Sequence, residues 1–323
     1  MTLKLRFSLI GFGIILFLIV TPILALYARG FMIDFNTRQI VKTGAMVIKT
    51  DPAKAAVYLN GKQQQSLTPT NIRFMAPADY DVRIEKAGFQ TWTKRLNVRQ
   101  QFVTWINLNR EAITLFLKDP KLEQTWITDN AKPYTDVEVA KIINIQQPVP
   151  MPIDSWFLEN NQLKYKKSDT DNPQIIADNI PPFTKSQIIR AENQIHLILD
   201  DALYAVNNGL EKIYSPVLAA AWDPASKQLI FGNNNEILIY NPSTKNTDLI
   251  LRSSSQISHP MLNSETGYVF FTADNKIKAI ELDSRDKKNI FDLVADLGNF
   301  TISTDGRTLY TFNNTKINKY TIR

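Results

Sequence analysis

The feature that most constrains this chain is an apolar run near its start. From Phe7 to Leu26, twenty consecutive residues carry no charged side chain. At 1.5 Å per helical residue they span about 30 Å, the thickness of the hydrocarbon core of a bilayer. Lys4 and Arg6 precede the run, so by the positive-inside rule we expect residues 1–6 to stay in the cytoplasm. The sequence therefore predicts one transmembrane helix over residues 7–27.

The residues after this run predict that the helix stays attached as a signal anchor. Signal peptidase requires small residues at positions −3 and −1 of its cleavage site. A cut after Ala28 would place Leu26 at −3, and a cut after Tyr27 would leave a bulky residue at −1. We therefore expect a single-pass protein of the cytoplasmic membrane, with a linker over residues 28–43 and the later domains outside the cytoplasm.

Composition narrows the possible chemistry. The chain has no cysteine, which excludes disulfide bonds, cysteine-ligated metals and thiol nucleophiles. Its net charge of +6 is uneven, being +4 over residues 1–44, +6 over 45–110 and −4 over 111–323. The basic part lies next to the predicted membrane span, where it either binds anionic lipid or wall polymer or is simply a solvated surface. No nucleic-acid-binding motif is present, so no nucleic-acid partner is expected.

Residues 44–110 have the pattern of a small β-sandwich. Short alternating or β-branched runs predict strands, and Asn60-Gly61 between two of them predicts a tight hairpin turn. The predicted strands cover residues 45–50, 55–59, 80–86, 92–98 and 102–108.

The order and spacing of the turns in this region resemble those of PEGA domains. The resemblance rests on four runs, which are Asp51-Pro52-Ala53-Lys54-Ala55-Ala56-Val57-Tyr58-Leu59-Asn60-Gly61-Lys62, Leu67-Thr68-Pro69, Pro77-Ala78-Asp79-Tyr80-Asp81-Val82-Arg83-Ile84 and Lys86-Ala87-Gly88-Phe89-Gln90-Thr91-Trp92. The chain departs from the family at the tetrapeptide that names it, which reads Pro52-Ala53-Lys54-Ala55, and at Ala78, where glycine is usual. The resemblance implies an extracytoplasmic β-sandwich and supplies no catalytic residues.

The last third of the chain repeats with a period of 40 residues. Three sets of similar residues share this spacing, namely Leu229, Val269 and Leu309, then Ile237, Ile277 and Ile317, and then Asn234, Asp274 and Asn314. Each repeat holds three or four short strands, with a tight turn at the Asn or Asp position. Four strands in 40 residues are typical of a β-propeller blade.

The repeat predicts a five- or six-bladed β-propeller over residues 111–323, with irregular first blades. Weaker strand patterns near Trp156, Leu163 and Ile175 and over residues 186–214 extend it towards the N-terminus. Pro148, Pro150 and Pro152 and the pair Pro181-Pro182 are expected in blade connections, because proline donates no ladder hydrogen bond. The final repeat lacks a fourth strand, and we expect the apolar run 112–117 to supply it by pairing with residues 317–322.

Catalytic and metal-binding motifs are weak throughout. His196 sits in an alternating run that predicts a surface-facing strand position, and His259 precedes Pro260 at a blade start. Ser284-Arg285-Asp286-Lys287 matches Ser-x-x-Lys, but it falls in a predicted turn without partner motifs. Asp169-Thr170-Asp171-Asn172 lacks the glycine and distal glutamate of a calcium loop. We therefore predict no catalytic residues, no metal and no cofactor.

Five residues are candidates for a binding surface. Trp156 and Trp222 fall at corresponding places near the first strands of two blades, where they either pack between blades or line the central mouth. The other three are the turn residues Asn234, Asp274 and Asn314. Trp92 and Trp105 are assigned to the sandwich core.

These observations predict an all-β ectodomain, a small sandwich followed by a propeller, on one transmembrane helix. The expected function is non-catalytic binding or scaffolding at the cell envelope, with a protein, peptide or glycan as partner. The alternative is a glycan-active hydrolase or lyase that uses propeller loops, which requires an acid and a base near the central mouth. Asp223, Asp305 and Glu192 are the carboxylates considered for that role.

Overall fold

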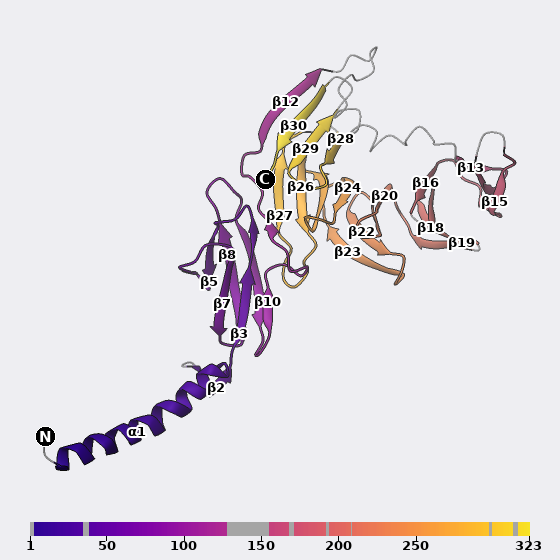
Figure 1. Ribbon diagram of the computed structural model, residues 1–323. Coiled ribbons are helices and arrows are strands. Elements are labelled where there is room, and N and C mark those ends of the chain that lie inside the picture. The colour runs from indigo at the N-terminus through magenta and orange to yellow at the C-terminus, as the bar shows by residue number, and fades with distance from the viewer. Residues whose placement is uncertain are drawn as a thin grey trace. The chain divides into compact units, whose positions relative to one another are not determined.

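The computed structural model describes residues 3–34, 39–127, 155–167, 171–191, 194–207, 209–296, 299–312 and 316–323. Its regular structure is one N-terminal helix followed by β-strands (Figure 1). The chain divides into two compact units. The first unit comprises Met1–Leu115 and Asp283–Asn289, and the second comprises Phe116–Leu282 and Ile290–Arg323.

Helix α1 (Leu3–Ala28) carries the apolar run. Its segment Ile10–Ala28 has a mean hydropathy of 2.5 and is not buried against the rest of the chain. Apolar side chains surround this segment on all sides, as expected of a helix in lipid rather than of an amphipathic surface helix. The predicted single apolar helix is confirmed, and by length and composition it is a candidate membrane anchor.

The residues expected to form a linker contain a hairpin. Strand β1 (Phe31–Asp34) pairs antiparallel with β2 (Gln39–Lys42). Lys42 lies opposite Phe31, and its ammonium group is 5.5 Å from the centre of the Phe31 ring. The antiparallel pairing extends one residue beyond the two strands, because Thr43 donates both its backbone N–H and its hydroxyl to the carbonyl of Gly30. The chain then continues from Thr43 into the sandwich.

The sandwich contains a three-stranded sheet, a four-stranded sheet and a short parallel pair. The first sheet has the order β10-β3-β7, the second β6-β5-β8-β9, and the pair is β11-β4. Alternation along β9 turns Trp92, Leu96 and Val98 inwards, where they are almost fully buried. The strand bounds are β3 (Gly44–Ile48), β4 (Thr50–Asp51), β5 (Ala56–Leu59), β6 (Lys62–Gln63), β7 (Thr70–Met75), β8 (Ala78–Glu85), β9 (Trp92–Val98), β10 (Val103–Trp105) and β11 (Ile113–Thr114).

All five predicted strands of the sandwich are present, and β7 is an addition. Three of its six side chains are exposed and only Met75 is buried, so its burial does not follow the alternation of a half-buried strand. The predicted Asn60-Gly61 turn is confirmed. It joins the paired residues Leu59 and Lys62, with φ of 48° at Asn60 and 79° at Gly61.

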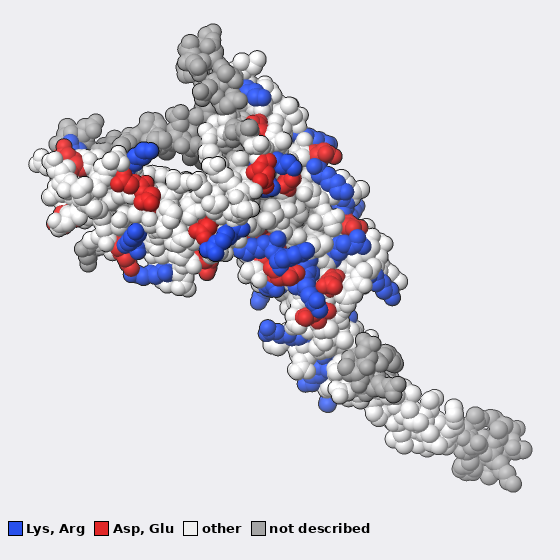
Figure 2. All heavy atoms as spheres, turned by 180° about the vertical axis from the view of Figure 1, so that it is seen from behind, with Lys and Arg blue, Asp and Glu red and all other residues white. Residues whose placement is uncertain are grey.

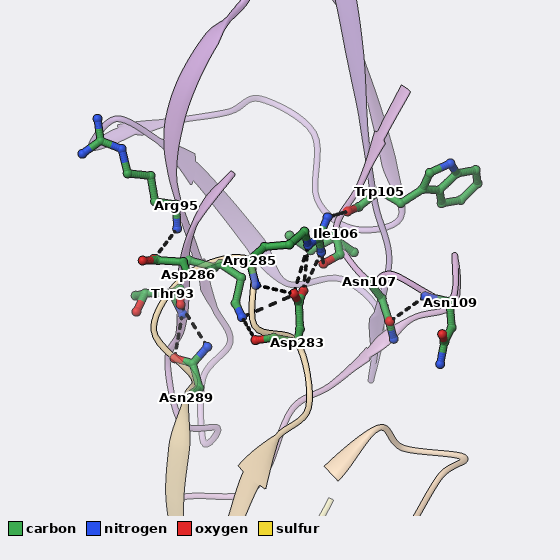
Figure 3. Close-up of polar contacts among 11 residues, drawn as sticks. Thr93, Arg95, Trp105, Ile106, Asn107, Asn109, Asp283, Arg285, Asp286 and Asn289 are labelled. Atoms are coloured by element: carbon green, nitrogen blue, oxygen red, sulfur yellow. Dashed lines mark hydrogen bonds and ion pairs between the residues drawn. The ribbon is translucent and has the colours of Figure 1, made fainter. Parts of the chain in front are cut away.

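The segment Asp283–Asn289 completes the first unit, although it connects two strands of the second (Figure 3). The Arg285 guanidinium donates to the carbonyls of Trp105 and Ile106, at 2.8 Å each, and pairs with Asp283 at 2.6 Å. The Asn289 amide donates to the Thr93 carbonyl at 2.9 Å. These bonds occupy backbone carbonyls of β9, of β10 and of Ile106, the residue after β10.

The described residues of the second unit form five antiparallel sheets. The first has three strands, β13 (Ser155–Glu159), β14 (Gln162–Lys166) and β15 (Gln174–Ala177). The next two have the orders β16 (Ser186–Arg190), β17 (Ile195–Leu199), β18 (Ala202–Asn207), β19 (Gly209–Tyr214) and β20 (Ala219–Asp223), β21 (Gln228–Gly232), β22 (Glu236–Asn241), β23 (Asn246–Arg252). The last two are β24 (Ser258–Asn263), β25 (Tyr268–Ala273), β26 (Lys276–Glu281), β27 (Ile290–Val294) and β12 (Lys121–Ile127), β30 (Lys316–Thr321), β29 (Thr308–Phe312), β28 (Asn299–Ile302).

The 40-residue repeat corresponds to equivalent strands of three sheets. Leu229, Val269 and Leu309 lie on β21, β25 and β29, and each is fully buried. Ile237, Ile277 and Ile317 occupy the matching places on β22, β26 and β30 and are also buried. The period therefore records side chains that must enter the core at the same point of each sheet.

Apolar clusters join each of the first three sheets to the next. Leu163 of the first sheet packs with Leu197 of the second, Ile198 of the second with Phe231 of the third, and Ile230 of the third with Phe271 of the fourth. The middle strands of the second, third and fourth sheets are buried on both faces. Their apolar runs are accordingly continuous rather than alternating.

The strand that completes the last sheet is not the one predicted. β12 pairs antiparallel with β30 from Lys121↔Thr321 to Ile127↔Lys316. The expected run 112–117 instead forms β11, which pairs with β4, and only Leu117 donates a backbone N–H to the carbonyl of Ile322. The run is apolar because Ile113, Leu115 and Phe116 are core residues, whereas β12 is an exposed edge strand with a polar sequence.

Lys54 offers a test of the strain in the sandwich. It stands at the third position of the Pro52–Ala55 tetrapeptide with φ of +63°, a left-handed conformation that glycine adopts more easily. Its side chain is exposed, while its backbone N–H donates to the Thr68 carbonyl at 2.7 Å. Replacing Lys54 with glycine should raise the free energy of unfolding by about 0.5–1 kcal/mol in urea titrations. Lys62→Gly also removes an exposed lysine but lies in strand β6, so it should lower stability. Destabilisation by both changes would contradict the prediction.

Arg285 provides a second test. Truncation to alanine leaves the carbonyls of Trp105 and Ile106 and the Asp283 carboxylate without this donor. We expect Arg285→Ala to lower the free energy of unfolding by about 2–3 kcal/mol. Arg95→Ala is the matched control, because Arg95 binds Asp286 through its backbone N–H and its side chain is 61% exposed. The control should cost less than about 0.5 kcal/mol, and equal losses would refute the assignment.

Candidate functional site

Three segments of the second unit form a polar surface at one end of their sheets. They are the β21–β22 turn with its following residue (Asn233–Glu236), the β23–β24 connection with the first two residues of β24 (Ser253–His259), and the β25–β26 turn (Asp274–Asn275). Ser253 donates its backbone N–H to the Asn235 carbonyl at 2.9 Å, and the Ser255 hydroxyl hydrogen-bonds the Asp274 carboxylate. We call these three segments the polar ledge.

Two of the predicted turn residues lie on this ledge. Asn234 is exposed and its carbonyl accepts a hydrogen bond from the backbone N–H of Ile257 at 2.6 Å. Asp274 is exposed and pairs with Lys278 at 2.8 Å. Lys278, followed by the Ser255 hydroxyl, lowers the pKa of Asp274, which keeps this carboxylate charged. The third turn residue, Asn314, lies outside the described residues.

Glu236 organises the first half of the ledge and was not predicted from the sequence. Its carboxylate accepts hydrogen bonds from the Asn233 amide at 3.0 Å, the Tyr214 hydroxyl at 2.9 Å and the Arg252 guanidinium at 2.8 Å. These three donors, Asn233 first, lower the pKa of Glu236. A cavity of about 340 Å³ lies here and is lined by Pro216, Leu218, Asn233, Asn234, Asn235, Glu236 and Arg252.

A second cavity, of about 510 Å³, lies on the other half of the ledge. His259 Nδ1 is 3.2 Å from the Ser258 hydroxyl, and the Thr272 hydroxyl is buried with no partner among the described residues. Both linings offer hydrogen-bond donors and acceptors but no Phe, Tyr or Trp ring. They suit a polar ligand such as a peptide backbone or a set of sugar hydroxyls. The second lining is Ser255, Gln256, Ser258, His259, Thr272, Ala273, Asp274 and Asn275.

A recurring backbone hydrogen bond supports this end of the sheets. In three successive sheets, a buried aliphatic residue in the connection to the next sheet donates its backbone N–H to a carbonyl of a hairpin turn. In the two four-stranded sheets this turn joins the second and third strands, and in the three-stranded sheet it joins the first and second. The pairs are Ile180 with Asn161 at 2.9 Å, Val217 with Asp201 at 2.7 Å and Ile257 with Asn234 at 2.6 Å. We call this bond the connection latch. Its sequence signal is one aliphatic residue within a polar or proline-containing stretch. Val217 and Ile257 share the 40-residue spacing of the repeat, whereas Ile180 lies 37 residues before Val217, so the period could have revealed two of the three.

The two candidate tryptophans pack in the core. The Trp156 ring lies 4.7 Å from that of Tyr165, and Trp222 packs on the cluster that joins the second and third sheets. The indole N–H groups of both are buried without a partner among the described residues. Neither Trp156 nor Trp222 lines the two cavities of the polar ledge.

The predicted surface position of His196 is wrong. This residue is fully buried on β17, its ring 6.4 Å from Trp222 and 6.1 Å from Tyr240. The alternation of its neighbours is misleading because both faces of the middle strand are covered. Burial lowers the pKa of His196 to about 4, so the ring is neutral at physiological pH.

The carboxylates considered for acid–base catalysis accept backbone hydrogen bonds within turns. Asp223 accepts the backbone N–H of Ser226 at 2.8 Å, and Asp305 accepts that of Arg307 at 3.0 Å. Glu192 and the predicted polar loop at Asp169 lie outside the described residues. Ser284 and Lys287 fall in the β26–β27 connection, as expected for a turn.

His196 makes the stability of the second unit depend on pH. Its folded pKa of about 4 lies below the unfolded value of 6.5, so the unfolded chain binds the proton first as pH falls. The free energy of unfolding should have its full value above pH 6.5 and should fall progressively towards pH 4, being lower by about 2 kcal/mol at pH 5. His196→Phe should remove this difference between urea titrations at pH 7.5 and pH 5. The exposed His259 is the control, and an equal effect of His259→Phe would contradict the assignment.

Comparison with known proteins identifies the sandwich. Residues 43–112 match the PEGA domain family. No curated protein matches the chain. Among solved structures, it is similar to the extracellular domain of the one component system BT4673 from Bacteroides thetaiotaomicron, with 14% identity over 85% of this chain and 39% of that one and a TM-score of 0.39. An auxiliary nutrient binding protein from the same organism has 10% identity over 83% of this chain and 78% of that one, with a TM-score of 0.35. Both TM-scores are too low to support an inference about this chain. The family match shows that the chain carries a PEGA domain at residues 43–112.

Proposed function

We propose that this chain is a non-catalytic binding or scaffold protein of the cell envelope. In this proposal, α1 anchors it in the cytoplasmic membrane and both units lie outside the cytoplasm. The charges Lys4 and Arg6 before the apolar run support that orientation, and the PEGA domain supports an extracytoplasmic location.

The five sheets of the second unit are proposed to be the blades of a β-propeller. Two observations support this arrangement. Apolar clusters join the first four sheets in succession, and the strand that completes the last sheet, β12, is the last described strand before the first sheet in the chain. A ring needs such an exchange, because pairing the start of the domain with its end removes two open sheet edges.

The polar ledge is the proposed binding surface, and it is the observation on which the function rests. Its turns are supported by the connection latch and by Glu236, so its polar groups are held in place before a ligand arrives. Many of them remain exposed beside two cavities. The proposed partner is an envelope protein, peptide or glycan that offers hydrogen-bonding groups to this surface.

Site-specific photo-crosslinking in intact cells tests the proposal. Benzoylphenylalanine placed at the exposed positions Asn234 and Asn275 should yield one crosslinked product of defined mass, identical at both positions. Thr244 is the matched control, since it is exposed in the β22–β23 turn at the opposite end of the same sheet. Equal products at all three positions, or a product at Thr244 alone, would refute the ledge as the binding surface. Turnover of envelope glycans by the purified chain would overturn the non-catalytic assignment.

A further inference from the structure

The end of the sandwich next to α1 combines exposed apolar side chains with unopposed positive charge. Four segments meet there, namely the end of α1 with the first two residues of β1 (27–32), β2 and the start of β3 (39–45), the end of β7 with the next two residues (73–77), and the β9–β10 connection with the first residue of β10 (99–103). We call this set of segments the helix-proximal rim.

Side-chain and backbone contacts bring these segments together. The Tyr27 ring stacks on Phe74 at 4.8 Å, which joins α1 to the end of β7. The Thr43 carbonyl accepts the backbone N–H of Gln101 at 2.8 Å, which joins β2 and β3 to the β9–β10 connection. A Cβ on Gly44 would lie 2.4 Å from the Arg99 carbonyl oxygen, so the absence of a side chain at Gly44 permits this close approach.

The rim exposes large apolar side chains that the sandwich core does not use. Phe102 is 65% exposed, Ile40 58%, Tyr27 53% and Val103 50%. Phe74 is 42% exposed even though its ring is stacked on Tyr27. Side chains of this size gathered at one end of a domain indicate a contact surface rather than scattered surface residues.

The same rim is basic. Its described side chains include Arg29, Lys42, Arg73 and Arg99 but no Asp or Glu. Arg29, Arg73 and Arg99 are exposed, and none forms an ion pair with a described carboxylate. On the face drawn in Figure 2, Lys and Arg atoms without Asp or Glu atoms among them lie where the sandwich leads into the helix.

We propose that the helix-proximal rim binds the surface of the membrane that α1 spans, with its cations on anionic phospholipid headgroups and its apolar side chains at the acyl boundary. The covalent continuity of the rim with the apolar helix selects lipid over a soluble partner, because a helix that crosses the bilayer ends at its surface. Aromatic rings and long basic side chains are the groups that favour this interface.

Fluorescence quenching in reconstituted vesicles tests the proposal. Because the chain has no cysteine, Gln100→Cys introduces a single site for an NBD label within the rim but leaves its apolar and basic residues intact. Ala87→Cys is the control, because it lies in the β8–β9 turn at the other end of these strands, about 25 Å away. In full-length protein in phosphatidylcholine vesicles with one third phosphatidylglycerol, doxyl lipids should quench the label at residue 100 at least about twofold more than at residue 87.

The charge contribution is tested separately. Replacing phosphatidylglycerol with phosphatidylcholine, or raising the salt concentration, should reduce quenching at residue 100. Arg73→Gln with Arg99→Gln should do the same, whereas Lys54→Gln with Arg110→Gln removes equal charge outside the rim and should not. The vesicles contain no wall polymer, so quenching reports lipid contact. Equal quenching at residues 100 and 87 would overturn the proposal, as would quenching at residue 100 that is insensitive both to phosphatidylglycerol and to the Arg73 and Arg99 changes.

Discussion

The constraint on which the second unit depends is that its second, third and fourth sheets have two apolar faces, and neither can remain in water. Middle strands such as β17 and β21 are buried on both sides, so each sheet requires a neighbour on each face. The apolar clusters meet this requirement by joining one sheet to the next, and the connection latch sets where the following sheet begins. Once the sheets are stacked in this way, their polar turns collect at one end and form the ledge.

Local patterns allowed much of this fold to be predicted. The 40-residue period located equivalent core positions such as Leu229, Val269 and Leu309, because a buried leucine or valine is required at the same point in each sheet. The Asn60-Gly61 turn was predictable because its backbone conformation suits few residue types. The turn residues Asn234 and Asp274 were identified from the same 40-residue period, and both belong to the ledge.

Features that depend on distant parts of the chain could not be predicted. β12 has a polar sequence and becomes a strand only because β30 offers an open edge nearly 200 residues later. Glu236 binds Tyr214 and Arg252 from neighbouring strands, and no motif links these residues in the sequence. His196 was assigned to the surface because its run resembles a half-exposed strand. Only the packing of Trp222 and Tyr240 against it makes that strand fully buried.

Both units are closed by chain segments that are synthesised late. Thr93 in the sandwich hydrogen-bonds Asn289, 196 residues further along, and Lys121 pairs with Thr321 near the C-terminus. Since a polypeptide is made from its N-terminus, neither unit can reach its final form before these later segments have been synthesised. Until then, β9 and β12 keep open hydrogen-bonding groups, and a chain released before that point would present them as unpaired edges. Each unit is therefore finished by a segment that is synthesised nearly 200 residues after the strand it completes.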